Sequence, residues 1–183
     1  MTPEQNHAAV ELVLGRISSA EFVERTGLDP VARPEIIESE LRSALVSKDA
    51  DTVESALFLA SRFDLFTADL GPLLTTLLLL PWHYRHEDIA SVLQGLRVPA
   101  TADALAQAAL IKHDYMDADD SHPFARKCIW ALADIGTPEA HAHLENLARA
   151  DDTEIAAYAQ RRLDKWHEEL SRKGSGALRK RTT

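Results

Sequence analysis

Residues 121–166 contain two successive helix stops and restarts, and this stretch constrains the fold more than any other part of the chain. Apolar residues recur at three- and four-residue spacing over 125–135, which predicts the buried face of an α-helix beginning at Pro123. Gly136 is expected to end that helix. Thr137-Pro138-Glu139 then has the order of a helix start: an N-cap, a proline in the first turn and an acid near the positive end of the dipole.

A third helix is predicted after the capping cluster Asp151-Asp152-Thr153. Its apolar face repeats that of the first helix after a shift of 31 residues. Phe124, Ala125, Cys128, Leu132 and Ile135 correspond to Ile155, Ala156, Ala159, Leu163 and Trp166. A repeat of this length built from two helices is typical of a stacked α-solenoid.

A weaker repeat precedes this stretch. Ala56, Leu59, Ala60 and Phe63 correspond, after a shift of 33, to Ile89, Val92, Leu93 and Leu96. Each set is followed by the same tripeptide, Thr67-Ala68-Asp69 or Thr101-Ala102-Asp103, which is expected to open a helix. The first of these apolar faces should lie on a helix capped by Asp51 with Glu54, after another helix over 34–47. About three and a half repeats are predicted over 52–169.

The first 33 residues predict a helical cap on such an array. Thr2 with Gln5 and Ser18 with Glu21 have capping-box spacing, the first helix should close near 15–17, and Gly27 should end the second. An end repeat needs a cap because it would otherwise expose its apolar face.

The string RKCIWALADIGTPEAHAHLENLARADDTEIAAYAQRRL resembles the short HEAT-like repeat family, over about 45 residues and more weakly over the preceding 70. The resemblance implies an all-α, right-handed α-solenoid of HEAT-like helical hairpins, with nine or ten helices and a groove for macromolecules. We therefore expect one domain over 1–171, with its cap over 1–33 and its repeats over 34–171.

The charge is unevenly distributed along the chain. Five of the 20 basic residues lie at 172–181 and none of the 29 acidic residues lies beyond 171, so residues 1–171 carry a net charge of −14. Such a body would repel a phosphate backbone, which argues against nucleic acid as a ligand, and would attract a basic protein. Residues 172–183 have too little apolar surface to fold and are expected to form a disordered basic tail.

Neither a membrane span nor a secretory signal is evident. The longest apolar stretch, residues 70–81, is interrupted by Gly71-Pro72 and Thr75-Thr76 and is shorter than the ~20 residues that a bilayer requires. We expect a cytoplasmic protein of bacterial type. The single cysteine, Cys128, lies on a predicted buried face and should be an inert core residue.

Residues 113–122 interrupt the repeat pattern and are expected to form an acidic insertion loop at one rim, where binding residues concentrate. His113, Asp114 and His122 could converge on a metal if this loop folds back. Asp117, Asp119 and Ser121 match only part of a calcium loop, because the glycine and the final glutamate are missing.

The densest polar cluster is Trp82-His83-Tyr84-Arg85-His86-Glu87-Asp88. Its His86-Glu87 pair resembles the iron-binding dipeptides of deoxyhypusine hydroxylase, a HEAT-like enzyme that needs four such pairs. The one other pair here, His167-Glu168, falls near a helix end. The favoured interpretation is that His86 to Asp88 form the first turn of a helix, where acids are stabilised by the dipole.

His141 and His143 should lie on opposite sides of their helix, because two residues span about 200°. We therefore predict no metal and no cofactor. Trp82, Tyr84, Tyr115 and Trp130 are candidate interface anchors, and Trp82 and Tyr84 are expected to be partly exposed. Trp130 could instead seal two neighbouring repeats.

The strings LPWHYRHEDIASVLQGL and RKCIWALADIGTPEA resemble HEAT-like immunity proteins of bacterial polymorphic toxin systems. The resemblance implies a non-enzymatic protein that occludes a basic toxin domain. The alternatives are a scaffold in a larger complex or a His-Glu metal enzyme, whereas a DNA glycosylase would need a basic face. The predicted partner-binding residues are Trp82, Tyr84, His86, Glu87, Asp88, Asp114, Tyr115, Asp117, Asp119 and Asp120.

Overall fold

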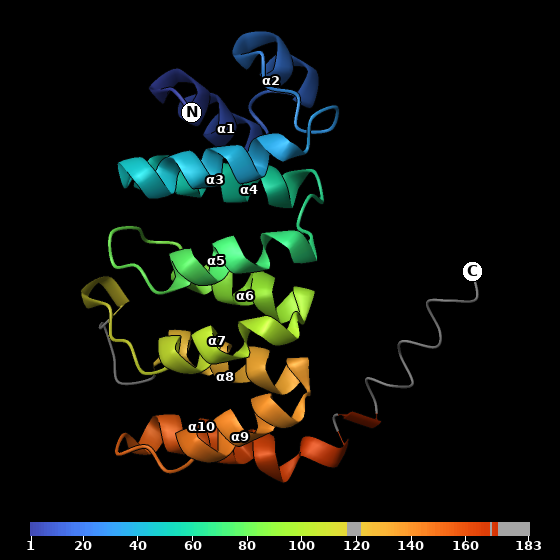
Figure 1. Ribbon diagram of the computed structural model, residues 1–183. Helices are drawn as coiled ribbons and strands as arrows, with labels where there is room; N and C mark the ends of the chain where they lie inside the picture. Colours follow the sequence, from blue (N-terminus) through green and yellow to red (C-terminus); the bar gives the residue numbers. More distant parts are fainter. Residues whose placement is uncertain (117–121, 169, 172–183) are drawn as a thin grey trace. The chain divides into compact units, whose positions relative to one another are not determined.

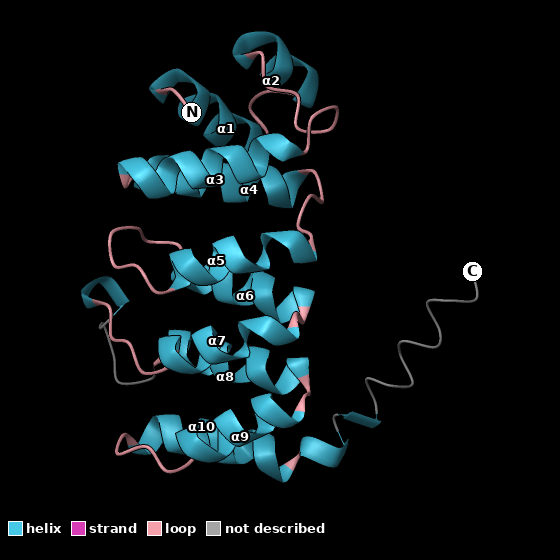
Figure 2. Ribbon diagram, in the orientation of Figure 1, coloured by secondary structure: helices cyan, strands magenta, loops and turns pink. Residues whose placement is uncertain are grey.

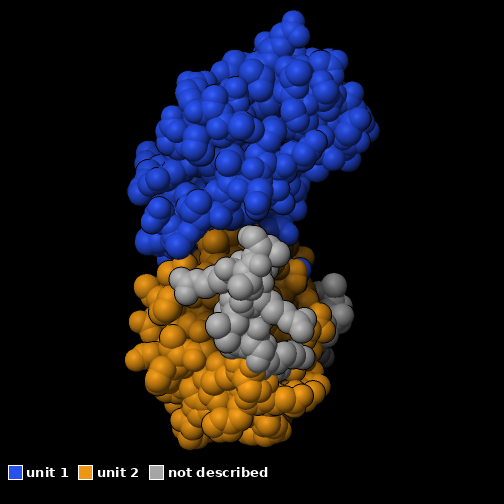
Figure 3. Space-filling view, turned by 90° about the vertical axis from the view of Figure 1, so that its right-hand side faces the viewer, with its two compact units in different colours: residues 1–89 blue, residues 90–183 orange. Residues whose placement is uncertain are grey.

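The computed structural model describes residues 1–116, 122–168 and 170–171, and every regular element among them is helical (Figure 1). In the colouring of Figure 2, helices and loops account for all of these residues. The predicted all-α class is thus confirmed. The predicted tail, 172–183, and part of the predicted insertion, 117–121, lie outside the described residues. The chain divides into two compact units, Met1–Ile89 and Ala90–Thr183 (Figure 3), and each is described by itself below.

The first unit contains six helical elements and the start of a seventh. They are α1 (Pro3–Val13), α2 (Ser19–Thr26), α3 (Glu35–Ser47), α4 (Ala50–Arg62), the 3-10 helix η1 (Ala68–Leu70), α5 (Gly71–Leu78) and the first residues of α6 (His86–Leu96). Helix α1 packs against α2 and α4, and α3 packs against α4 and α5. The largest fully buried side chains of this unit are Phe22, Ile37, Leu41, Leu59, Leu74, Leu77, Leu78 and Ile89.

The first two helix starts agree with the sequence prediction. The side chains of Thr2 and Ser18 each accept a hydrogen bond from the backbone N–H three residues later. In return, the side chains of Gln5 and Glu21 accept the backbone N–H groups of Thr2 and Ser18. Gly27 ends α2 with φ 69°, a left-handed conformation that glycine adopts without steric cost. Helix α1 ends at Val13, before the predicted region.

The predicted cap of α4 is wrong. The N-cap is Asp49 rather than Asp51, because the Asp49 carboxylate accepts the Thr52 backbone N–H at 3.1 Å. Lys48 ends α3 in a left-handed conformation with φ 57°, so the chain turns within a single residue and α4 begins earlier than the spacing predicted.

The second unit holds the rest of α6, the 3-10 helices η2 (Pro99–Thr101) and η3 (Asp114–Met116), and the helices α7 (Ala102–Ala108), α8 (Pro123–Ile135), α9 (Pro138–Leu147) and α10 (Thr153–Asp164). Helix α8 packs against α7, α9 and α10, and α9 also packs against α7 and α10. The fully buried core residues of the second unit include Leu105, Cys128, Ile129, Leu132, Leu144 and Ala159. The expected burial of the cysteine is therefore confirmed.

The predicted restarts over 121–166 are confirmed. Helix α8 begins at Pro123, and Gly136 ends it with φ 73°. The Thr137 hydroxyl accepts the Ala140 backbone N–H at 3.2 Å, and Asp152 caps α10 through the Glu154 and Ile155 backbone N–H groups. Of the two tripeptides, Thr67-Ala68-Asp69 opens the helical segment that begins at Ala68, whereas Ala102 begins α7 directly after the 3-10 helix that starts at Pro99. None of the described helices has both the length and the apolar character of a membrane span.

Candidate functional site

Two buried histidines shape the turn between α5 and α6. The Nε2 atom of His83 lies 2.8 Å from the carbonyl oxygen of Leu77, and that of His86 lies 2.8 Å from the carbonyl oxygen of Leu80. The backbone N–H of Arg85 donates to Nδ1 of His83 at 3.1 Å, so the ring hydrogen of His83 is on Nε2 and is donated to Leu77. The two imidazoles stack with their centroids 4.1 Å apart. The turn is therefore fastened to the C-terminal end of α5.

Arg85 fastens the same turn to α4. Its guanidinium forms an ion pair with Glu54, lies 3.4 Å from Asp88 and covers the ring of Phe58 at 4.9 Å from the centroid. Glu54 and Phe58 are one helical turn apart on α4, so both contacts fall on one face of that helix. The backbone around residue 84 is consequently held from two sides.

This fixed turn presents an aromatic side chain to the outside. Tyr84 is 66% exposed, whereas Trp82 is half-buried with its ring edge-on to His83, the centroids being 5.3 Å apart. Glu87 is half-buried and Asp88 is exposed, both in the first turn of α6. The predicted partial exposure of Trp82 and Tyr84, and the predicted helix start, are confirmed. The arrangement is a rigid turn that offers an aromatic ring beside a carboxylate.

His86 cannot take the direct partner contact that the sequence suggested. Its side chain is fully buried, with its ring stacked on His83 and its Nε2 atom directed at a backbone carbonyl. A residue in this position acts by holding the turn in place. No sequence pattern distinguishes His86 from its exposed neighbours, because its burial depends on a contact with the carbonyl oxygen of Leu80, beyond the end of α5.

The candidate metal ligands are not brought together. Within the described ranges, no group of three or more His, Cys, Asp or Glu side chains is placed to hold a metal ion. His141 packs edge-on against Trp166 at 4.8 Å, while Nε2 of His143 lies 2.7 Å from Asp103, so these two histidines have different neighbours, as predicted. His167 and Glu168 are both exposed.

In the second unit, a histidine also anchors the residues before the predicted insertion. His113 is buried, with its ring edge-on to Phe124 at 5.3 Å, and its carbonyl oxygen accepts the Met116 backbone N–H at 2.8 Å. Asp114 is exposed and Tyr115 is 41% exposed. The remaining predicted acids of this segment, Asp117, Asp119 and Asp120, lie outside the described residues, as does the partial calcium motif.

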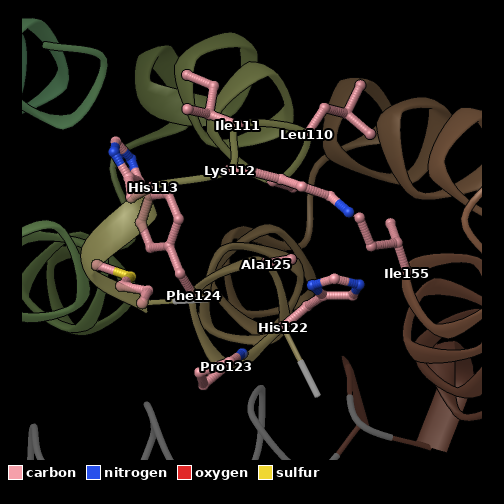
Figure 4. A pocket seen from close by; sticks show the side chains of 11 residues that line it. Leu110, Ile111, Lys112, His113, His122, Pro123, Phe124, Ala125 and Ile155 are labelled. Carbon is pink, nitrogen blue, oxygen red and sulfur yellow. The ribbon is translucent and has the colours of Figure 1, made fainter. Parts of the chain in front are cut away.

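A small cavity lies between the end of α7 and the start of α8 (Figure 4). It has a volume of about 30 Å³, enough for about two water molecules, and its lining is largely apolar. His113 and His122 line opposite sides of it, with their rings apart in Figure 4, so they do not converge with Asp114 on one point.

His122 instead contacts the cap of α10. Its Nε2 atom lies 2.9 Å from the Asp152 carboxylate, and the Lys112 ammonium lies 3.9 Å from it. Burial alone would raise the pKa of Asp152. The backbone N–H groups of Ile155 and Glu154 together with the charges of His122 and Lys112 outweigh that effect, and the pKa is lowered.

No protein-family model, curated protein or solved structure matches this chain. The resemblance to HEAT-like repeats and to immunity proteins therefore stays a prediction.

A second aromatic cluster went unrecognised as a unit in the sequence. Trp130 is 41% exposed on α8, and the guanidinium carbons of Arg126 and Arg162 lie 5.6 and 5.5 Å from its ring centroid. The four-residue spacing of Arg126 and Trp130 was a usable signal, because it places both on one helix face. Arg162 belongs to α10, and no sequence signal connects it to Trp130.

Proposed function

We propose that this chain is a non-catalytic protein-binding module that engages a basic partner through the turn at residues 82–88. The observation that carries the proposal is the position of Tyr84, which is largely exposed although its backbone lies between two buried, hydrogen-bonded histidines. Exposed aromatic residues on fixed backbone are typical anchors of protein interfaces.

The energetic reason lies in pre-organisation. A partner that covers Tyr84 gains a large apolar contact, while little backbone freedom is lost because His83 and Arg85 already hold the turn. Aromatic side chains add contact area with few rotatable bonds. The turn is thus suited to binding without rearrangement.

Charge favours a basic partner. Asp88 is exposed next to the aromatic turn, and residues 1–171 carry a net charge of −14. An excess of one sign accelerates encounter with a protein of the opposite sign and suppresses encounter with anionic ligands. The exposed Asp114 and Tyr115 of the second unit offer the same combination of acid and aromatic ring.

We further propose that the helices form a right-handed α-solenoid of HEAT-like hairpins. Support comes from the contacts inside the second unit, where α8 and α9 each pack against their immediate neighbours and also against the helix two positions away. Neighbour and next-neighbour packing is expected of stacked helical hairpins. The 31-residue repeat of apolar positions adds to this support.

The narrower form of the proposal is that the partner is a toxin domain and that binding occludes its active cleft. The test uses the full chain as bait for proteins of a bacterial lysate, in parallel with the Tyr84→Ala, Asp88→Lys and Arg42→Ala variants. Arg42 is an exposed residue of α3 paired with Glu38, so its replacement serves as a matched surface control.

A basic protein should be captured by the wild type and by Arg42→Ala, and about tenfold less by Tyr84→Ala. Equal capture by all four proteins would overturn the role of the turn. Expressing the captured protein in bacteria, first alone and then together with this chain, distinguishes an immunity protein from a scaffold. Growth arrest relieved by co-expression indicates immunity, whereas a harmless partner that belongs to a larger complex indicates a scaffold.

A further inference from the structure

Trp130 lies between two arginines at the surface of a strongly acidic chain. Arg126, one turn earlier on α8, and Arg162, on the neighbouring helix α10, flank its indole ring at 5.6 and 5.5 Å. The ring remains 41% exposed between them. Tyr158 and Arg161 extend this surface along α10, with the guanidinium carbon 4.9 Å from the phenol ring centroid.

The charges on this surface are only partly compensated. Arg161 lies 3.6 Å from Glu154, and Asp134, one turn beyond Trp130, accepts the Gln94 side-chain amide at 2.6 Å. Arg126, by contrast, has no carboxylate within 4.0 Å in the described part of the chain, and its guanidinium lies over the indole ring. A guanidinium stacked on an aromatic ring still presents its N–H groups outward, where they can bind a carboxylate.

We propose that the Trp130 surface binds an acidic segment of a partner protein that also carries an aromatic or aliphatic side chain. The segment's carboxylate pairs with Arg126, and its apolar side chain packs on the exposed part of the indole. This site differs in charge and in helices from the turn at 82–88, so the chain would offer one surface to basic and another to acidic protein segments.

Chemistry favours a peptide over a nucleic acid here. The net charge of −14 on residues 1–171 opposes the long phosphate backbone of a nucleic acid, whereas a short acidic segment needs to meet only Arg126 beside Trp130. A few arginines around one tryptophan match the size of a short linear segment.

The test titrates the full chain with a glutamate-rich copolymer of glutamate and tyrosine, with polyglutamate and with a thymidine oligonucleotide, following the indole N–H signal of Trp130 by NMR. The copolymer should bind more tightly than polyglutamate, because polyglutamate lacks the aromatic group. Trp130→Ala and Arg126→Ala should each weaken copolymer binding, by about tenfold and about threefold. Arg42→Ala, which removes an exposed arginine of α3, should leave it unchanged.

Three results would overturn the proposal: copolymer affinity unaffected by Arg126→Ala, an equal loss on Arg42→Ala, or preference for the oligonucleotide. The last would assign the surface to nucleic acid. Arg126 is exposed and lies outside the core, so Arg126→Ala should leave the fold intact. It therefore tests the binding surface even if Trp130→Ala weakens the packing of α8 on α10. Loss of copolymer binding with intact capture through Tyr84 would separate this site from the binding turn.

Discussion

The imidazole of His83 donates to the carbonyl oxygen of Leu77 and accepts the backbone N–H of Arg85, so one buried side chain closes both sides of the turn that carries Tyr84. His113 has the corresponding place before Tyr115 in the second unit, buried against Phe124 with an exposed tyrosine two residues later. In both units a histidine supplies hydrogen bonds or packing where the chain leaves a helix, and an aromatic ring faces outward beside it.

His83→Ala should destabilise the protein strongly. The substitution leaves a cavity, removes the acceptor of the Arg85 N–H and removes one of the donors to the Leu77 carbonyl, which keeps the Leu80 N–H. We expect a loss of about 2–4 kcal/mol in the free energy of unfolding. Urea denaturation followed by circular dichroism measures this loss. Tyr84→Ala is the control, since its exposed side chain should change stability by about 0.5 kcal/mol or less. Similar effects of the two substitutions would argue against the hydrogen-bonded role of His83.

Gly136→Ala and Gly95→Ala should have opposite effects. Gly136 has φ 73°, and a Cβ there would lie 2.8 Å from Cδ2 of Leu170, so alanine should cost about 1–2 kcal/mol. Gly95 lies inside α6 with open space around its Cα, and alanine there should stabilise the protein by about 0.5–1 kcal/mol. Thermal denaturation of both variants checks the signs. Equal shifts in one direction would contradict the backbone argument.

The sequence reveals those parts of the fold that are determined locally. Gly136 and Thr137-Pro138 could be recognised as a helix stop and start because each acts on residues within one turn. The cap of α4 was misplaced because Asp49 and Asp51 are both plausible caps, and the choice between them depends on the left-handed turn at Lys48.

Contacts that connect separate elements leave no such signal. The cluster at 82–88 was recognisable as polar and aromatic, but the burial of His86 depends on a carbonyl oxygen beyond the end of α5. Likewise, Trp130 was a candidate anchor from its residue type, while the arginine beside it on α10 follows from how two helices pack. The cluster at 82–88 could therefore be singled out from the sequence, whereas the burial and contacts of its residues are known only from the structure.

Asp49→Ala and Asp51→Ala test the corrected cap directly. Loss of the Asp49 carboxylate leaves the Thr52 backbone N–H and hydroxyl without their acceptor and should cost about 1 kcal/mol. Asp51 is exposed in the first turn of α4, so its replacement should cost about 0.5 kcal/mol or less. Chemical denaturation at neutral pH ranks the two, and a larger effect of Asp51→Ala would restore the sequence-based assignment.

Asp152 should make the stability of the second unit dependent on pH. The pKa of its carboxyl in the folded state is lowered below the usual value of 3.8. Burial raises this pKa, but the hydrogen bonds from the Ile155 and Glu154 backbone and the charges of His122 and Lys112 lower it by more. A lowered folded-state pKa means that the ionised form favours folding. The contribution is complete above about pH 5 and is lost as pH falls through the folded-state pKa.

Asp152→Asn separates this charge effect from capping, because asparagine still accepts hydrogen bonds from the first turn of α10. The variant should be less stable than the wild type at neutral pH. The difference should vanish as the pH falls through the folded-state pKa of Asp152, below which the wild-type carboxyl is protonated and uncharged like asparagine. Asp152→Ala should remain about 1 kcal/mol less stable even there, since a neutral carboxyl group still caps the helix and alanine cannot. Urea denaturation across this range provides the measurement. A wild-type advantage over Asp152→Asn that persists unchanged at acidic pH would show that the contact with His122 and Lys112 contributes by shape rather than by charge.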